Sequence, residues 1–264
     1  MISPFLFSKT LNSETPQMKS RFQLLLVMLN IVLICIVIFL LSPFNPRYQA
    51  GNNFKEINVE RINVVNEDGT TVIAIANKQR IAAPRMNGKE YPVEMIERQH
   101  FAGMIFFNEE GDEMGGLVFN SGKFSNGKNY GVGHLSFDRY NDNQVINLEY
   151  KENIHGLVQS GITFYDRTGD GSFGKNLDLL EEYYYSEPSE ERKQEIKEEI
   201  NELKAEKKLG TERIFLGSKN SVPQLILKDQ KGKERIRMVV DSSNIARLQF
   251  LDEDGRVLKE FSEE

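Results

Sequence analysis

Three residues whose side chains can take part in hydrolysis alternate along one segment, His134, Ser136 and Asp138. A serine, a histidine and an acid can supply a nucleophile, a general base and an orienting group. Leu135 and Phe137 lie between them, which is typical of a strand with the three polar side chains on one face. Residues two apart on a strand are about 6.6 Å apart, and no Gly-x-Ser-x-Gly turn holds the serine. The pattern therefore favours the polar face of a half-buried strand, and we predict no catalytic residue.

A second candidate for chemistry is a metal site at Asp166, Thr168 and Asp170, which have the spacing of the first ligands of a calcium loop. Leu177 occupies the twelfth position, where such a loop needs a bidentate acid. The three histidines of the chain also lack the spacing of zinc ligands. We therefore predict no metal site and no cofactor, and a calcium-stabilised surface module remains an alternative.

These residues lie within a recurring turn motif, in which two alternating apolar residues precede Asp or Asn, with Gly three positions later. Its turn residues are Asn66 and Gly69, Asn108 and Gly111, Asp166 and Gly169, Asp229 and Gly232, and Asp252 and Gly255. A looser copy has Arg139 and Asp142. Asp or Asn can hydrogen-bond the turn backbone and Gly accepts positive φ, so each copy predicts a short hairpin connection.

The hairpin series predicts a mainly β fold of antiparallel strands over 55–175 and 211–261. Only the last two copies have a clear spacing, 23 residues, and the irregular spacing elsewhere argues against a propeller or solenoid. We therefore expect a meander, a sandwich or a roll. Because a single hairpin is not stable in water, the hairpins must stack or extend one sheet to bury their apolar faces.

One inserted amphipathic helix is predicted over Glu190–Leu209, which is rich in Glu and Lys. Ile196, Ile200 and Leu203 have helical spacing and form a narrow apolar face of this helix. Packing of this helix face on its own domain is favoured over a short coiled coil with another chain. The neighbouring tyrosines 183–185 are interpreted as packing residues or as an aromatic platform for a sugar.

The segment 22–41 contains no charged residue and is long enough to cross a bilayer as a helix. It exceeds the usual apolar region of a signal peptide, and no cleavage site with small residues follows it, since Tyr48 stands where a small residue is needed before Ala50. The basic residues of 1–21 favour a cytoplasmic N-terminus and an extracytoplasmic C-terminal domain. The predicted location is the cell membrane, with a single pass through 22–41 as a signal anchor.

Composition agrees with a tethered acidic domain. The chain has 264 residues with 39% hydrophobic side chains, one Cys and no Trp, which excludes a disulfide framework. Residues 42–264 carry 30 basic and 38 acidic side chains, so no nucleic acid partner is expected. The predicted organisation is a cytoplasmic tail over 1–21, a transmembrane helix over 22–41, a linker over 42–54, a β-hairpin domain over 55–176, a helical insertion over 177–210 and C-terminal hairpins over 211–264 on the same domain.

The stretches 60–69, 102–111 and 135–140, with the sequences ERINVVNEDG, AGMIFFNEEG and LSFDRY, resemble those of bacterial single-pass membrane-anchored proteins of uncharacterised function. The resemblance covers about 55–175, together with the C-terminal turn motifs. It implies a bacterial envelope setting and a hairpin ectodomain, and it transfers no catalytic residue.

The sequence thus predicts a membrane-anchored extracytoplasmic binding or scaffold protein, with the bilayer as one partner and a protein or a second copy of the chain as another. The competing hypothesis is an envelope hydrolase acting on glycan or peptide, with Asp138 or Glu149 in a cleft. A deep pocket around His134 would favour the hydrolase.

Overall fold

The computed structural model describes residues 16–41 and 54–262, in two compact units divided after Asn58. Residues 1–15 of the predicted tail and 42–53 of the predicted linker lie outside the described residues, and so does the expectation for Tyr48 and Ala50. In the first unit, helix α1 (Pro16–Leu41) begins before the apolar segment. Its first residue is Pro16, and proline is well tolerated at the first helical position. Its window Gln23–Leu40 has a mean hydropathy of 3.0 and is long and apolar enough to cross a membrane. A membrane anchor and a signal sequence both have this composition.

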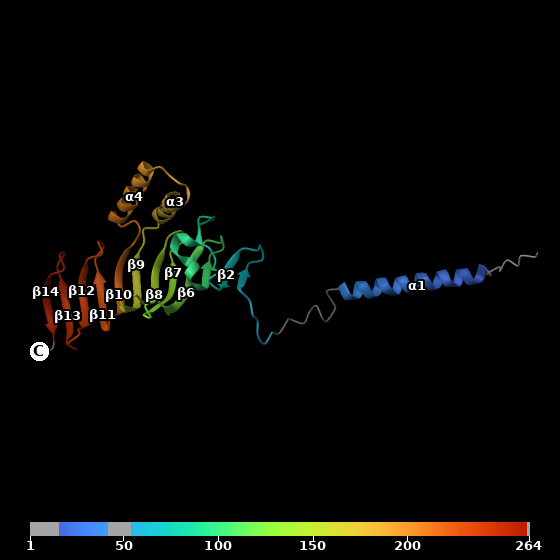
Figure 1. Cartoon of the computed structure of the whole chain (residues 1–264), viewed down its shortest axis with the longest axis horizontal. Coiled ribbons are helices and arrows are strands. Elements are labelled where there is room, and N and C mark those ends of the chain that lie inside the picture. The colour runs from blue at the N-terminus through green and yellow to red at the C-terminus, as the bar shows by residue number, and fades with distance from the viewer. Residues whose placement is uncertain (1–15, 42–53, 263–264) are drawn as a thin grey trace, which may run out of the picture. The chain divides into compact units, whose positions relative to one another are not determined.

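The second unit is built on one antiparallel sheet of 12 strands (Figure 1). Its strands are β1 (Arg61–Val65), β2 (Thr71–Ala76), β5 (Ala102–Phe107), β6 (Glu113–Lys123), β7 (Asn129–Asp138), β8 (Gln144–Glu152), β9 (Val158–Asp166), β10 (Thr211–Lys219), β11 (Val222–Lys228), β12 (Glu234–Val240), β13 (Ala246–Leu251) and β14 (Val257–Ser262). Each strand pairs with its neighbours in chain order, so the sheet is a meander. The mainly β prediction is confirmed at this level.

Most of the predicted turn residues do connect paired strands. The glycine N–H donates to the carbonyl of the Asp or Asn three residues earlier at Gly69, Gly111, Gly232 and Gly255, and all four glycines have positive φ. The looser copy also forms a turn, between β7 and β8.

The prediction for Asp166 and Gly169 is wrong, because β9 is followed by a helix rather than by a second strand. Asp166 forms an ion pair with Arg213 of the neighbouring strand β10. The N–H of Gly169 donates to Asp142 at 2.8 Å, so a long-range contact replaces the local turn.

The helical insertion contains two helices, not one, α3 (Ser172–Tyr185) and α4 (Glu190–Ala205). The first begins before the predicted start of the insertion at Leu177. Residues 186–189 separate the helices, and the Ser189 hydroxyl caps α4 by accepting a hydrogen bond from the Arg192 N–H at 3.2 Å. Ile196, Ile200 and Leu203 pack with Leu179 of α3, so the predicted apolar face of α4 lies against its own domain.

The core on one face of the sheet is formed by the segment 81–101. It includes a small two-stranded sheet, β3 (Arg85–Met86) and β4 (Lys89–Glu90), and two short 3-10 helices, η1 (Val93–Ile96) and η2 (Arg98–His100). Ile81 and Ala82 pack on Ala74 and Ile105 of the large sheet. Met86 and Tyr91 pack with Leu177 of α3, so this segment joins the helical insertion to the sheet.

Candidate functional site

The most extensive unusual feature of the sheet is a row of apolar side chains that crosses every strand. In the strand register the row is Ile62, Ile75, Met104, Leu117, Leu135, Leu148, Ile162, Leu216, Leu225, Met238, Leu248 and Phe261. Each residue lies directly opposite the next on the neighbouring strand. Because side chains directly opposite each other point to the same face, the row lies on one face of the sheet.

A second row runs beside the first on the same face. It consists of Val64, Ile73, Phe106, Gly115, Phe137, Ile146, Phe164, Ile214, Leu227, Ile236, Phe250 and Lys259. Only Gly115 and the terminal Lys259 interrupt its apolar character. We refer to the two rows together as the apolar stripe.

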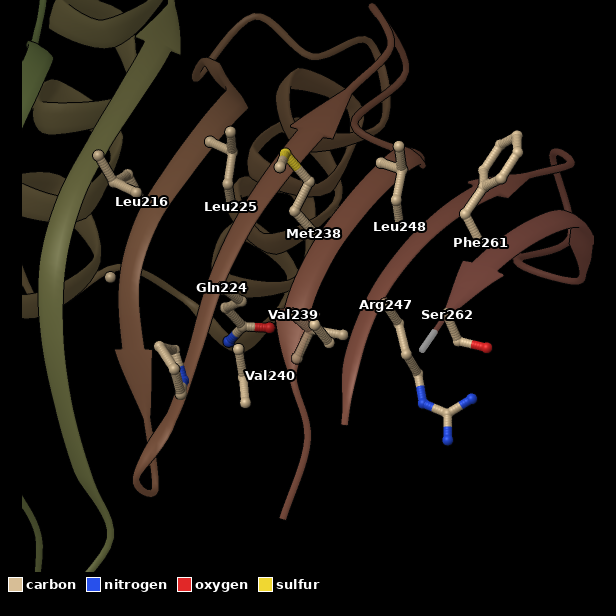
Figure 2. A pocket seen from close by; sticks show the side chains of 13 residues that line it. Leu216, Gln224, Leu225, Met238, Val239, Val240, Arg247, Leu248, Phe261 and Ser262 are labelled. Atoms are coloured by element: carbon tan, nitrogen blue, oxygen red, sulfur yellow. The ribbon is translucent and has the colours of Figure 1, made fainter. Parts of the chain in front are cut away.

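The apolar stripe is open to solvent in the described residues. Leu148, Leu216 and Phe261 are 50%, 53% and 52% exposed. Over β10–β14 the stripe lines a shallow groove of about 550 Å³. Figure 2 shows Leu216, Leu225, Met238, Leu248 and Phe261 in line across these strands. Side chains of this type in a folded domain normally lie against another layer.

The opposite face is covered or polar along its length. The segment 81–101 covers the strands nearest β1. In the middle of the sheet, Ser136, Asn147 and Thr163 form a buried polar row. At the other end, Arg247 pairs with Asp241 at 2.8 Å and with Glu260. The opposite face is therefore covered by protein or made of polar side chains, whereas the apolar stripe is neither.

A second candidate site is a polar cavity between this opposite face and the covering segment. Two adjoining hollows of about 150 Å³ and 290 Å³ share Arg98, Glu113 and Gln144 in their linings. Arg98 and Glu113 form an ion pair at 2.6 Å, and Arg98 also donates to the Ala82 carbonyl at 3.2 Å. Both side chains are largely removed from water, 9% and 16% exposed.

The structure divides His134, Ser136 and Asp138 between the two hollows. His134 and Ser136 line the smaller hollow, and Asp138 lines the larger one. No hydrogen bond joins any two of these three described residues. His134 faces Glu149, with 4.0 Å between Nδ1 and the carboxylate oxygen, and its Nε2 is buried without a hydrogen-bond partner.

Burial dominates the electrostatics of this cavity. It raises the pKa of Asp138 to about 7, with a further contribution from the negative charge of Glu113. It also lowers the pKa of His134, against the opposing effect of Glu149. Asp138 is thus the one candidate from the sequence whose protonation is poised near neutral pH, which is a property of general acids and bases.

The residues considered as calcium ligands form hydrogen bonds or an ion pair with other residues of the protein. The Thr168 hydroxyl donates to Asp170 at 2.8 Å, and the Ser172 N–H donates to the same carboxylate at 3.0 Å. Hydrogen bonds from Ser172 and Thr168 lower the pKa of Asp170 to about 2. With Asp166 paired to Arg213, the set does not converge, and no group of three or more His, Cys, Asp or Glu in the described ranges is arranged to hold a metal ion.

The tyrosines of α3 have different surroundings. Tyr183 packs against the α3–α4 core, whereas Tyr184 and Tyr185 are 64% and 46% exposed. Tyr183 and Tyr184 meet edge to face, with ring centroids 4.9 Å apart. Packing explains Tyr183, and the edge-to-face contact means that Tyr184 does not extend it into a flat platform.

The open state of the apolar stripe and the roles of Arg98 and Glu113 are not predicted by the sequence. The alternation of apolar residues places the stripe on one face but gives no sign of whether another layer covers it. Arg98 lies in a segment with no strand or helix periodicity, so nothing local indicated its contact with Glu113.

Comparison of the chain with protein-family models, curated proteins and solved structures returns no match. The candidate sites therefore rest on their own geometry.

Proposed function

We propose that this chain is a single-pass membrane-anchored binding or scaffold protein whose extracytoplasmic sheet domain works through the apolar stripe. One observation carries the proposal, the size of that open surface. The 12 strands lie about 4.8 Å apart, so the stripe is about 50 Å long. Each of its two rows is about 6.7 Å wide, the spacing of alternate residues along a strand, which gives an area of roughly 700 Å². The largest apolar patch on a typical monomeric protein is about 300–600 Å² and is often functional.

The anchor part of the proposal is supported by α1, whose window Gln23–Leu40 is long and apolar enough to cross a membrane. Alkaline carbonate extraction of cell membranes tests it, because only an inserted protein stays in the pellet. An intact mass that includes 1–21 then separates an anchor from a cleaved signal sequence. Protease treatment of sealed vesicles, with tags on both ends, tests the orientation, since only the C-terminal tag is expected outside the cytoplasm.

A second candidate function, a hydrolase of the cell envelope, is favoured by one observation, the placement of Asp138 in a cavity beside Glu113 and Arg98. Against it, Ser136 and His134 make no hydrogen bond to each other or to Asp138. Incubation of the purified protein with peptidoglycan fragments and peptides tests it. An activity that Asp138→Asn abolishes without lowering the unfolding temperature would favour the hydrolase over the binding function.

A further inference from the structure

We infer that the occupant of the apolar stripe is a second copy of this chain, so that two sheets stack face to face around the two rows. The inference rests on the proposed function and names its partner. It starts from the kind of surface that the stripe presents, which is a regular array of aliphatic and aromatic side chains with one residue of each row per strand.

A β-sheet is the natural complement of such an array. Two sheets that pack face to face lie about 10 Å apart, and the side chains of their inner faces interdigitate. A second copy supplies a sheet with the same strand spacing and the same apolar rows. In a two-fold symmetric interface the same patch is used on both subunits, so a uniform apolar surface is self-complementary without further design.

The area agrees with a stable pair. A stripe of roughly 700 Å² on each copy gives about 1,400 Å² in total, within the usual range of about 1,200–2,000 Å² for specific protein interfaces. The stripe extends to both edge strands, β1 and β14. At its two ends Ile62 is 41% exposed and Phe261 is 52% exposed. A partner of the same width as this sheet is needed to cover it.

A small apolar ligand is a poorer occupant. Ligand sites usually enclose most of the ligand and contain a few convergent polar groups that fix its orientation. In the two rows the only charged side chain is Lys259, which lies at the last strand with its ammonium group 4.7 Å from the ring of Phe261. The groove over β10–β14 is open along the stripe and covers only part of it.

Anchoring adds to the association. Copies tethered to the same bilayer have an effective concentration far above that of free protein. A modest intrinsic affinity is therefore enough for association. The opposite face is a poorer surface for a second sheet, because it carries charged side chains, among them Arg237 paired with Glu234 and Arg247 paired with Asp241.

The test is co-purification of two differently tagged full-length copies from membranes in a mild detergent, followed by native mass spectrometry. We expect one tag to recover the other and the mass to be an integer multiple of the chain. Leu148→Lys/Leu216→Lys should reduce recovery at least tenfold, because it places charges in the first row. The matched control, Gln159→Lys/Gln249→Lys, adds the same charge on the opposite face and outside the groove, and it should leave recovery unchanged.

Four results would overturn the inference: a monomer with an open stripe, a monomer whose extra mass is lipid, a complex with a different protein, or equal recovery of the two double variants. A different protein or a lipid held on the stripe would leave the proposed binding function intact, whereas a monomer with an open stripe would contradict both. A circular dichroism spectrum and an unfolding temperature for each variant separate loss of association from loss of folding. If Leu148→Lys/Leu216→Lys does not fold, Leu148→Ala/Leu216→Ala replaces it, with recovery expected to fall in the same direction.

Discussion

Phe106 on β5 and Phe137 on β7 stack across the strand between them, with ring centroids 6.3 Å apart and an interplanar angle of 16°. They meet because the residue between them in the register is Gly115, which has no side chain. Gly115 also has a φ of +123°, and a Cβ there would lie 2.3 Å from the Ser136 carbonyl oxygen. One glycine therefore permits both the aromatic contact in the stripe and the local path of β6.

Gly115→Ala should lower the free energy of unfolding by at least about 1 kcal/mol, since alanine strains a positive φ and contacts the neighbouring backbone. The measurement is thermal unfolding of the purified full-length protein. Gly133→Ala is the control, because Gly133 lies in the adjacent strand with open space around its Cα. Equal unfolding temperatures for the two variants would show that the path of β6 is not as constrained as its geometry indicates.

Removing the Arg98 side chain should destabilise the domain by about 3–5 kcal/mol, because it leaves the carboxylate of Glu113 buried without its partner. The matched variant Arg80→Ala breaks an ion pair with Glu60 whose side chains are 63% and 70% exposed. Such a surface pair contributes about 0–1 kcal/mol. Denaturant unfolding of both variants measures the difference, and similar losses would indicate that water reaches the cavity freely.

The pH dependence of stability should contain a contribution from Asp138. Below about pH 4 its carboxyl is protonated in both the folded and the unfolded state. As the pH rises to about 7, the unfolded chain releases this proton and the folded protein retains it, so the free energy of unfolding falls by up to about 4 kcal/mol. Above pH 7 both states are ionised and the contribution is constant.

Asp138→Asn removes this titration, so its stability relative to the natural chain should increase from about pH 4 to 7 and then level off. Asp254→Asn, at a side chain that is 70% exposed, should show no such trend. Unfolding free energies at several pH values provide the comparison. A difference between Asp138→Asn and the natural chain that is independent of pH would place the Asp138 carboxylate in water.

The sequence predicted the parts of this fold that local chemistry determines. Asn66 with Gly69 and Asp252 with Gly255 mark turns because the same short hydrogen bonds form wherever these residues have this spacing. Alternation also assigned residues such as Leu225 and Leu227 to one strand face. Each of these features depends on residues within a few positions of one another.

The remaining features depend on contacts between distant residues. The segment 81–101 covers one end of the sheet, so which face becomes the core is decided far from the strands themselves. Asp166 has the sequence context of the other turn residues, yet it is the last residue of β9, pairs with Arg213, and is followed by α3. The pKa of Asp138 depends on burial and on Glu113, 25 positions earlier, which periodicity does not reveal.

The most direct test of the central claim, that the apolar stripe is a covered binding surface, is the rate of maleimide labelling in membranes. Cys35 is first replaced by Ala, and Leu148→Cys is compared with Lys151→Cys on the opposite face of the same strand, since these two side chains are 50% and 51% exposed in the single chain. Labelling at position 148 should be at least tenfold slower, and solubilisation that separates the copies should restore it. Equal rates at the two positions in intact membranes would show an uncovered stripe and contradict the account.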